Sequence, residues 1–415
     1  MKAFDTVNRI GSSRPLRRAT NTVLSLHSED LVVRAMKRTG LSDLGIESIG
    51  EPLEILCRAL QDDRAAMHPF GRYAARTQLI GLLATRAKVI QLTAAHPEIE
   101  ASPVERPIVI MGMPRTGTTF LQRLLSRDVG LRHLPYWEAL APMPEGSPLD
   151  RDAPTARRVR AAQRSIEFVD RVAPAMRTIH ELDAHEADEE IWLLAVHMSS
   201  MIFECTWNVP AFAEWYDGAD LREGYGWLRR MMQVLGWYRS GEQWLLKSPQ
   251  HLERIPDLVA TFPGVVLVQT HRDPVSVVTS TASMITTGRP VSSDRVDPDQ
   301  IGRYWTWRLD RMLDRNMAQR DQLGDELGTP VIDLRFHELM ADPMAAVDHI
   351  YATAGRELGD DARAAMVRYL DQRPRHHFGA HRYQPEDYGI DRVKVREQFA
   401  AYCERFGVQA DATDA

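Results

Sequence analysis

The chain has 415 residues, of which 44% are hydrophobic and 26% charged, as is usual for a globular protein and unlike a disordered or fibrous one. Its 51 basic and 57 acidic side chains give a formal net charge of −6, which argues against a nucleic-acid-binding protein that depends on a generally basic surface. The three cysteines have neither the spacing of a disulfide framework nor that of a metal site, so a reducing compartment is expected.

The N-terminal segment, MKAFDTVNRIGSSRPLRRATN, is basic but has no continuous apolar stretch of the kind that a secretory signal requires. The most apolar stretch elsewhere, residues 191–203, spans 13 residues and includes one histidine and two serines. It is too short to cross a bilayer and predicts a single buried helix. Together these features predict a cytoplasmic protein without a transmembrane segment.

Residues 1–100 are predicted to be helical, because apolar side chains recur there every three or four positions, and His96-Pro97 predicts the end of the last helix. From Arg106 the pattern changes to short apolar runs, each followed by a turn or an amphipathic segment. Strands are predicted in PIVIMG (107–112), QWLLKSP (243–249), GVVLVQTHRDP (264–274) and TPVIDLRFHELMADP (329–343). Strands that alternate with helices indicate an α/β fold, with a P-loop-like parallel sheet flanked by helices.

Two further stretches are predicted to be helical. The sequence from about residue 143 to residue 240 interrupts the alternation, and we expect a helical insertion that covers one edge of the site. Residues 393–406, VKVREQFAAYCERF, predict a final helix. The expected organisation is an N-terminal helical region, residues 1–100, that packs on an α/β domain formed by residues 101–415.

The most informative motif is GMPRTGTT, residues 112–119, which follows the first predicted strand and precedes an amphipathic helix. It matches the phosphate-binding pattern GxxxxGK[ST] in length, in its second glycine, Gly117, and in its final Thr119. Glycines in such a loop let consecutive backbone N–H groups surround an anion at a helix N-terminus. Thr118 replaces the lysine of the pattern, and the positive charge comes from Arg115 inside the loop. Without that lysine, an ordinary kinase or ATPase is not expected.

A second arrangement suited to phosphate lies in HRDPVSVVTS, residues 271–280. Arg272 follows an apolar strand, and Ser280 stands eight residues later. Asp273 is a good N-cap and Pro274 a good first helical residue, so a helix that begins here would carry Ser280. An arginine at a helix entrance and a hydroxyl two turns further on suit a phosphate monoester.

PRTGTT after an apolar strand, together with the spacing of Arg272 and Ser280, resembles the sulfotransferase family, which uses 3′-phosphoadenosine 5′-phosphosulfate (PAPS) as donor. PYWEALAP, DAHEADEE, WLLKSPQHL and VIDLRFHELMADP are similar to other stretches of the family, so the resemblance runs from about Pro107 to Tyr388. It implies transfer of a sulfuryl group by in-line displacement, without a metal. The acceptor is expected to be a hydroxyl of a small molecule, a lipid or a carbohydrate.

The resemblance also implies roles for individual residues. Arg272 and Ser280 would bind the 3′-phosphate, and Arg382 near the C-terminus is expected to contact the same end of the donor. Lys247, at the end of QWLL, would stabilise charge on the transferring sulfonate. The loop is expected to bind the 5′-phosphosulfate through Arg115, Thr116, Gly117, Thr118 and Thr119.

Two residues are candidates for the group that takes the proton of the attacking hydroxyl. Glu138 in PYWEALAP lies nineteen residues after Thr119, about where related sulfotransferases carry a catalytic glutamate. Its aromatic neighbours would desolvate the carboxylate and make it more basic. His251, four residues after Lys247, is the second candidate, since cytosolic sulfotransferases use a histidine just after the equivalent lysine.

Other patterns carry less information. DAHEADEE, residues 183–190, holds five carboxylates and fits either a solvated helix face or the acidic start of a helix. His180, Glu181 and His185 lack the spacing of a zinc HExxH motif, and Asp333 is interpreted as structural and not as a Walker B aspartate. Two alternatives stay open: a nucleotide-binding module without turnover, and a lysine-less P-loop kinase of a small molecule.

Overall fold

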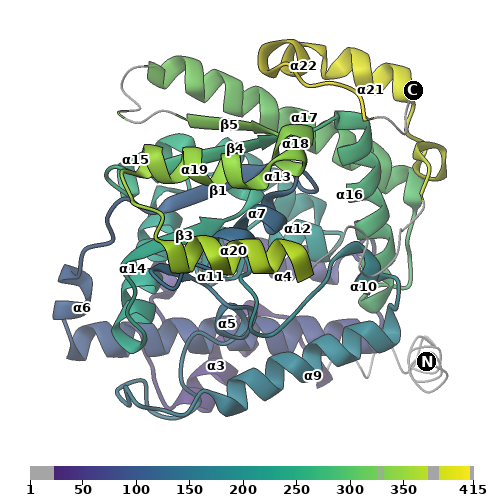
Figure 1. Cartoon of the computed structure of the whole chain (residues 1–415). Helices are drawn as coiled ribbons and strands as arrows, with labels where there is room; N and C mark the ends of the chain where they lie inside the picture. Colours follow the sequence, from purple (N-terminus) through teal and green to yellow (C-terminus); the bar gives the residue numbers. More distant parts are fainter. Residues whose placement is uncertain (1–22, 325–327, 329–330, 373–382, 412–415) are drawn as a thin grey trace.

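The computed structural model describes residues 23–324, 328, 331–372 and 383–411. At its centre lies a sheet of five parallel strands in the order β2-β3-β1-β4-β5 (Figure 1). The strands are β1 (Ile108–Gly112), β2 (Leu131–His133), β3 (Gln243–Lys247), β4 (Val266–His271) and β5 (Val331–Arg335). The predicted α/β fold with a helix-flanked parallel sheet is confirmed.

The sequence predicts four of these strands and misses β2 at the edge of the sheet. With three residues, β2 is too short to show a two-residue period. It is a strand because Leu131 and His133 align with Gln243 and Leu245 of the longer neighbour β3. Its presence is therefore decided by tertiary pairing and not by local pattern.

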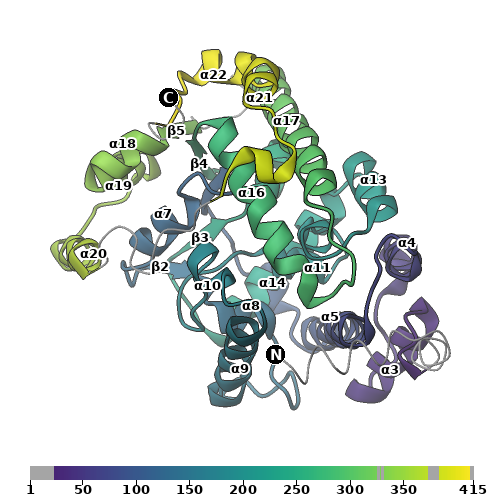
Figure 2. The ribbon, with the colours of Figure 1, turned by 90° about the vertical axis from the view of Figure 1, so that its right-hand side faces the viewer.

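The two faces of the sheet pack against separate apolar clusters, because successive side chains of a strand point to opposite faces. On β1, Ile108 and Ile110 belong to the cluster that contains α7 (Thr118–Leu125), α19 (Pro343–Ala354) and α20 (Asp360–Gln372). Val109 and Met111 belong to the larger cluster, which contains α16 (Pro274–Gly288) and α17 (Pro298–Leu323). Figure 2 shows α19 and α20 on one side of the sheet and α17 on the other.

The order of the strands determines where a ligand would bind. β1 lies between β3 and β4, and the chain turns into α7 after β1 but into α16, on the opposite face, after β4. In open α/β sheets a crevice forms outside the carboxyl ends of the strands at such a point, and ligands bind there. The loop of residues 112–119 and the Arg272 segment both begin at these carboxyl ends.

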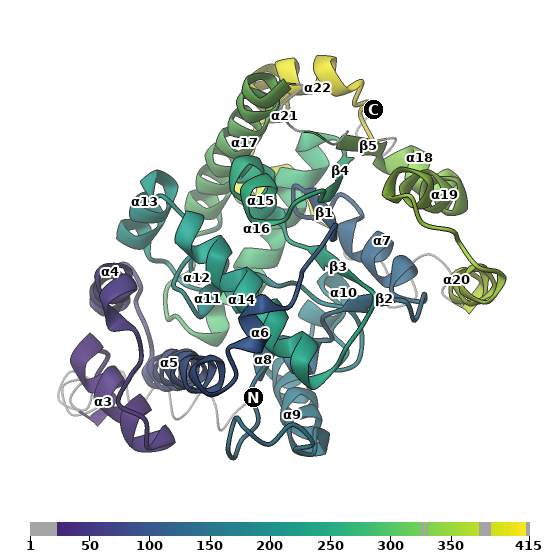
Figure 3. The same ribbon diagram turned by 90° about the vertical axis from the view of Figure 1, so that its left-hand side faces the viewer.

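The N-terminal helices share a core with the sheet. Leu53 and Leu83 belong to the same buried cluster as Val109 of β1 and Leu246 of β3. The long helix ends at Ala95, before His96-Pro97, as predicted. These helices are α3 (Ser28–Thr39), α4 (Gly50–Gln61), α5 (Pro69–Ala95) and α6 (Glu98–Ala101). In Figure 3, α3, α4 and α5 lie on the side of the molecule opposite α19 and α20, and α6 lies nearer the middle, beside α14.

Helices fill most of the chain between β2 and β3. They are α8 (Tyr136–Leu140), α9 (Ala156–Val172), α10 (Met176–Ile179), α11 (Ile191–Ala195), α12 (Ile202–Thr206), α13 (Pro210–Gly218) and α14 (Arg222–Tyr238). No helix among the described residues is both long and apolar enough to span a bilayer.

The prediction of a single buried helix over residues 191–203 is wrong. The stretch is divided into α11 and α12, and Met198 between them has a φ of 58°, in the left-handed region. The side chain of Gln250 holds the turn, because its Nε2 donates to the carbonyl of Ser199 at 2.8 Å and its Oε1 accepts from the amide of Met201 at 3.1 Å. A contact from a distant segment therefore overrides the local apolar pattern.

The segments after β3 complete the fold. The predicted final helix is divided at Phe399 into α21 (Arg392–Gln398) and α22 (Ala400–Phe406). The remaining elements are η2 (Pro249–Glu253), α15 (Ile255–Thr261), η3 (Arg289–Val291), α18 (Phe336–Ala341) and η5 (Pro385–Tyr388), with η1 (Ile46–Ser48) near the N-terminus.

Candidate active site

The loop of residues 112–119 is folded as the phosphate-binding pattern predicts, between β1 and α7. A Cβ on Gly112 would lie 2.4 Å from Thr270 Oγ1, so β4 passes too close for any other residue at this position. Gly117 has a φ of 90° directly before α7. Arg115 also has a positive φ, 70°, which is costly for a residue with a Cβ and is typical of functional loops.

Side-chain contacts fix the interior of the loop. The hydroxyl of Thr116 lies 2.7 Å from the carbonyl of Met113 and 2.6 Å from the hydroxyl of Thr270 on β4. Helix α7 begins at Thr118, and the first amides of a helix have no partners within it. The loop thus presents free donors to an anion at the carboxyl end of β1.

Arg272 and Ser280 meet the same loop, as the sequence suggests. Arg115 Nε donates to Ser280 Oγ at 3.1 Å, and Arg272 Nη1 donates to the backbone oxygen of Arg115 at 2.8 Å. The predicted start of α16 is confirmed, because Asp273 caps it by accepting from the amide of Val275 at 3.1 Å. Burial lowers the pKa of Arg115, and the charge of Arg272 lowers it further. This concentration of positive charge favours a bound anion.

Lys247 reaches the loop from the neighbouring strand. It is the last residue of β3 and is 1% exposed, and its Nζ donates to Thr119 Oγ1 at 3.2 Å and to Glu189 Oε1. Its backbone amide donates to Glu190 Oε2 at 2.9 Å. The ammonium group therefore lies at the start of α7, beside the loop donors.

The acidic segment DAHEADEE has neither of the two expected forms. It is not helical up to residue 189, bends at residues 184–186 and runs beside the chain between β2 and α8: the amide of Tyr136 donates to the carbonyl of Glu186 at 3.1 Å, and that of Asp188 to Leu134 at 2.8 Å. Glu190 precedes α11, but its carboxylate binds the Lys247 amide and does not cap the helix. The segment brings Glu189 to the Lys247 ammonium group.

Two neighbours of Lys247 have shifted pKa values. Burial raises the pKa of Asp188 to about 6; Lys247 acts to lower it, and Glu189 to raise it further. Burial lowers the pKa of His180 to about 3, and Lys247, Arg115 and Arg123 contribute in the same direction. His180 is therefore neutral at pH 7, and Asp188 is close to its titration range.

Comparisons with known proteins agree with this geometry. Residues 107–360 match the model of the sulfotransferase family, and this stretch contains the loop, Lys247, Arg272 and Ser280. The chain belongs to the sulfotransferase family.

Two solved structures are similar to this sulfotransferase. The sulfotransferase STF1 from Mycobacterium tuberculosis H37Rv is 30% identical, and the match covers 90% of this chain and 98% of that one with a TM-score of 0.76. The sulfotransferase STF9 from Mycobacterium avium is 28% identical, and the match covers 92% and 97% with a TM-score of 0.81. No curated protein matches the sequence.

These matches assign the reaction class. The protein is a transferase that moves sulfuryl groups, and neither the kinase nor the nucleotide-binding module without turnover is favoured. The described residues contain no group of three or more His, Cys, Asp or Glu side chains placed to hold a metal ion. Asp333 binds Arg320 and His271, in line with a structural role; burial acts to raise its pKa, but these hydrogen bonds lower it to about 2.

The two expected proton acceptors of the sulfotransferase lie in different surroundings. His251 is fully buried, with Nδ1 2.8 Å from the hydroxyl of Tyr225 and Nε2 2.5 Å from Glu190 Oε1. Both ring nitrogens are therefore engaged. The contact with Glu190, which also holds the Lys247 amide, links the histidine to the lysine through one carboxylate.

Glu138 lies in an ion cluster at the edge strand. It is 2% exposed, and its Oε2 accepts from Arg132 at 2.8 Å and from Arg239 at 3.1 Å. Arg239 directly follows α14 and precedes the amino end of β3, whereas Lys247 stands at the carboxyl end. The contacts of Glu138 are thus with the β2 edge and not with the loop. Arg382, the remaining candidate, lies outside the described residues.

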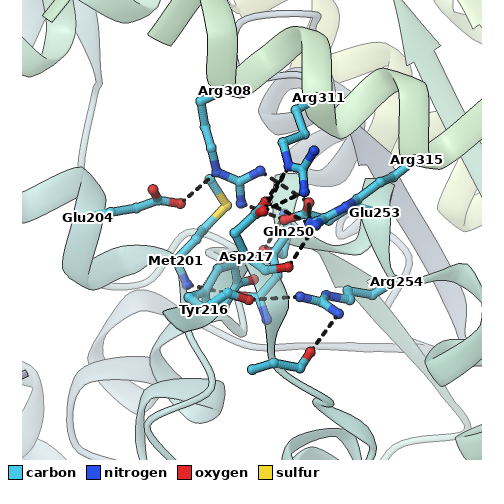
Figure 4. A network of polar contacts seen from close by, with 12 residues as sticks. Met201, Glu204, Tyr216, Asp217, Gln250, Glu253, Arg254, Arg308, Arg311 and Arg315 are labelled. Atoms are coloured by element: carbon cyan, nitrogen blue, oxygen red, sulfur yellow. Dashed lines mark hydrogen bonds and ion pairs between the residues drawn. The ribbon is translucent and has the colours of Figure 1, made fainter. Parts of the chain in front are cut away.

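A buried network of charged groups supports the segment that follows Lys247 (Figure 4). Glu253, at the end of η2, accepts from Arg308 Nη1 at 3.1 Å and Nη2 at 2.5 Å, and from Arg315 at 3.1 Å. Arg308 Nε donates to Glu204 on α12 at 3.1 Å. The backbone of η2 is held too, since Asn316 on α17 donates to the carbonyl of Leu252 at 2.8 Å. Helix α17 therefore positions the turn that carries His251.

Proposed function

We propose that this sulfotransferase uses PAPS as the donor and a hydroxyl group of a small molecule, a lipid or a carbohydrate as the acceptor. The observation that carries the proposal is that Lys247 contacts the loop at Thr119, while Arg115 of the same loop contacts Ser280 and Arg272. Donors for a 5′-phosphosulfate thus adjoin an arginine and a hydroxyl suited to a 3′-phosphate. ATP has no 3′-phosphate and would leave the second group unused.

The residues of the site fit the charge of this donor. The loop from Thr116 to Thr119 and the guanidinium of Arg115 bind the 5′ end, and Arg272 and Ser280 bind the 3′-phosphate. The groups are cationic or are N–H and O–H donors, as a polyanion requires. Deep burial of Lys247 and Ser280 strengthens these interactions, because the local dielectric constant is lower than in water.

Lys247 stabilises the transition state, in which negative charge develops on the leaving oxygen. The acceptor oxygen attacks sulfur, the bond between sulfur and the phosphate oxygen breaks, and adenosine 3′,5′-bisphosphate (PAP) leaves with the electron pair. The Lys247 ammonium beside Thr119 neutralises negative charge on the sulfonate and on the leaving oxygen. Arg115 and the loop amides hold the leaving phosphate.

The proton of the acceptor hydroxyl goes to a carboxylate, and the geometry favours Glu189 over Glu138 and His251. Glu189 contacts the Lys247 ammonium, so its carboxylate lies beside the group that we propose binds the transferring sulfonate. Glu138 is paired with two arginines at the β2 edge, and His251 has no free ring nitrogen. His251 and Glu190 position Lys247.

The experiment that tests the donor is turnover of sulfur-labelled PAPS with a panel of phenol, steroid, carbohydrate and lipid hydroxyls, with and without excess chelator. We expect label in at least one acceptor, at a rate that the chelator does not change. Turnover of ATP that requires magnesium, without any turnover of PAPS, would contradict the proposal.

The assignment of the 3′-phosphate is tested by calorimetry on Arg272→Ala. Binding of PAP should weaken by about 2 to 4 kcal/mol, as for the loss of a charged hydrogen-bond donor, while binding of adenosine 5′-monophosphate should hardly change. An equal loss of affinity for both ligands would contradict the assignment of Arg272 to the 3′-phosphate.

The assignment of the base is tested by comparing Glu189→Gln with Glu138→Gln and His251→Gln. Glu189→Gln should lower kcat by about 100- to 10,000-fold and abolish the low-pH limb of kcat/KM. An acceptor of lower pKa, such as an activated phenol, should rescue this variant more than the other two. If the limb disappears only in Glu138→Gln, Glu138 is the base.

A further inference from the structure

A small cavity lies away from the loop, between α12, α13, η3 and the first turns of α17. Its volume is about 90 Å³, and its walls include Trp207, Asn208, Arg289, Gln300, Tyr304 and Trp305. None of its lining residues belongs to the group assigned above to the donor. Since one water needs about 10 to 15 Å³ of such volume, the cavity holds a ligand of roughly six to nine non-hydrogen atoms.

The cavity contains a buried charge without a counter-ion. Arg289 is 7% exposed, and the hydrogen bond that its guanidinium makes in the described part of the chain is from Nη2 to the carbonyl of Glu204, at 3.3 Å. Its Nε is buried without a hydrogen-bond partner, and no carboxylate among the described residues lies within 4 Å of the guanidinium. Burial of an unpaired charge is costly, which favours an anion here.

Other buried arginines of the protein are better satisfied. Arg86 donates to two carbonyl groups and a serine hydroxyl and stacks on Trp227 at 3.8 Å. Arg158 donates to two carbonyl groups and stacks on Trp137 at 4.8 Å. Arg308 has two glutamates. Arg86 and Arg158 each also have one buried nitrogen without a partner, but Arg289 has the fewest partners of the four.

Two carboxylates line the cavity, and the buried one, Glu204, is already used; Asp297 is exposed and caps α17 by accepting from the amide of Gln300 at 3.0 Å. Glu204 lines the cavity, but its Oε1 accepts from Arg308 at 3.1 Å and its Oε2 from the hydroxyl of Tyr304. The backbone oxygen of Glu204 accepts from Arg289, and the Glu204 carboxylate acts on Arg289 through its charge without a hydrogen bond or ion pair. Burial lowers the pKa of Arg289 to about 10, so the group still carries its charge at neutral pH.

From these observations we infer that the cavity is a second binding site, which takes a small organic anion: a carboxylate held by Arg289 on a flat apolar body held between the aromatic walls. Trp207 and Trp305 are 3% and 1% exposed and offer apolar surface. Asn208 and Gln300 offer side-chain amides for a second polar group. The site is distinct from the PAPS site and does not depend on the donor proposed above.

The probe is benzoate, with benzamide as the uncharged molecule of the same shape. Calorimetry on the full chain should show that benzoate binds at least about 10-fold more tightly than benzamide. Saturation with PAP should leave the benzoate affinity unchanged. Benzoate binding that PAP abolishes would place the anion in the phosphate loop, and equal binding of the two probes would exclude recognition by Arg289; either result overturns the inference.

Two variants and a control locate the site. Arg289→Gln should weaken benzoate about 10- to 100-fold. Gln300→Glu, a change at an exposed lining position, should weaken it by placing a like charge at the cavity. Arg303→Gln, on the exposed face of the same helix α17, removes an arginine outside the cavity and should leave the affinity unchanged. Unaltered benzoate binding in both Arg289→Gln and Gln300→Glu overturns the inference.

A structural role for Arg289 makes a different prediction. If the guanidinium were needed to hold η3, Arg289→Gln would melt well below the wild type without ligand. We expect it to melt at the same temperature or higher, because the unpaired charge is gone, and to lose the rise in melting temperature that benzoate gives the wild type. The proposal would be contradicted if ligand-free Arg289→Gln melted far below the wild type and benzoate still raised its melting temperature by the full amount.

Discussion

At the scale of single residues, the loop carries on Arg115 a positive charge that no carboxylate of the described residues balances, whereas Lys247 pairs with Glu189 and Arg272 with Asp411. Lys247 is buried between Thr119 and Glu189, and Arg115 has no carboxylate partner among the described residues, although burial lowers its pKa. Such groups have lost hydration and cannot rearrange freely. They are organised for an anion before it binds, which is how an enzyme stabilises a transition state without reorganisation.

Removal of the Lys247 ammonium separates chemistry from binding. If the group acts mainly on charge that develops during transfer, Lys247→Ala should lower kcat about 100-fold or more and change PAP affinity little. Single-turnover kinetics and calorimetry measure the two quantities on one sample. A matched loss in both would mean that Lys247 binds the donor in its ground state.

The raised pKa of Asp188 makes stability depend on pH. In the folded state burial raises this pKa to about 6 from 3.8, so the folded protein retains the proton more strongly than the unfolded chain. The resulting stability is complete below about pH 3.8 and is lost as the pH rises through about 6. The free energy of unfolding of Asp188→Asn, relative to the wild type, should therefore increase by about 2 to 3 kcal/mol between pH 4 and pH 8. Urea denaturation at both pH values measures it; a constant difference would contradict the assignment.

At the scale of elements, the segments after β3 and α22 hold the residues proposed for the site. α17 holds η2 through Glu253, and the chain beyond α22 returns to the start of α16, where the amide of Asp411 donates to Asp273 Oδ2 at 3.0 Å. Asp411 also accepts from Arg272 Nε at 2.8 Å. The carboxylate of Asp411 is thus bound to Arg272, the arginine that we propose binds the 3′-phosphate.

The contact of Asp411 predicts competition with the donor. A 3′-phosphate must replace the carboxylate on Arg272, so Asp411→Asn should tighten PAP about 2- to 10-fold, in keeping with a partly exposed ion pair. Adenosine 5′-monophosphate should bind unchanged. Glu404→Gln, an exposed acid on α22, is the control for net charge. Weaker PAP binding in Asp411→Asn would show instead that the segment supports the donor.

The Glu253 network predicts a large loss of stability. Glu253→Gln leaves Arg308 and Arg315 of α17 without this carboxylate, and breaking a buried pair in this way costs about 3 to 5 kcal/mol. Asp321→Asn, which breaks a surface pair with Arg405, should cost no more than about 1 kcal/mol. Denaturant titration of both variants measures the difference. Equal losses of unfolding free energy in the two variants would mean that the buried network stabilises the fold no more than the surface ion pair does.

At the scale of the whole molecule, the site occupies the point where the helices that follow the strands change from one face of the parallel sheet to the other. The loop after β1 and the turn after β4 lead to helices on opposite faces, and Lys247 enters from β3. A ligand bound there connects segments that are distant in sequence. PAP at 100 times its Kd should therefore stabilise the fold by about 2.7 kcal/mol, with or without magnesium, whereas ATP at the same concentration should stabilise it less. Thermal melts with the two nucleotides test this, and a larger shift with ATP would contradict it.

Local motifs account for the part of the fold and site that the sequence predicts. The glycine loop with Arg115, the N-capped helix that carries Ser280, and the strand that ends at Lys247 are each determined within about ten neighbouring residues. Strand order then brings their carboxyl ends together, as parallel pairing requires. That the loop, Lys247, Arg272 and Ser280 lie together was therefore predictable; their roles toward the donor stay a prediction.

The parts that the sequence does not reveal depend on contacts between distant segments. Glu189 lies beside Lys247 because residues 184–190 pair with the chain after β2, and the turn at Met198 exists because Gln250 binds its backbone. The aromatic neighbours of Glu138 in the sequence favour a role as the base, yet its carboxylate is bound by arginines from β2 and from the end of α14. Apolar period, caps and glycines are read from neighbouring residues, and so the sequence alone determined the sheet, the loop and the reaction class that they suggest. Which carboxylate meets the lysine was decided by tertiary structure, because a charge takes its partner from whatever the packed chain brings within a few ångströms.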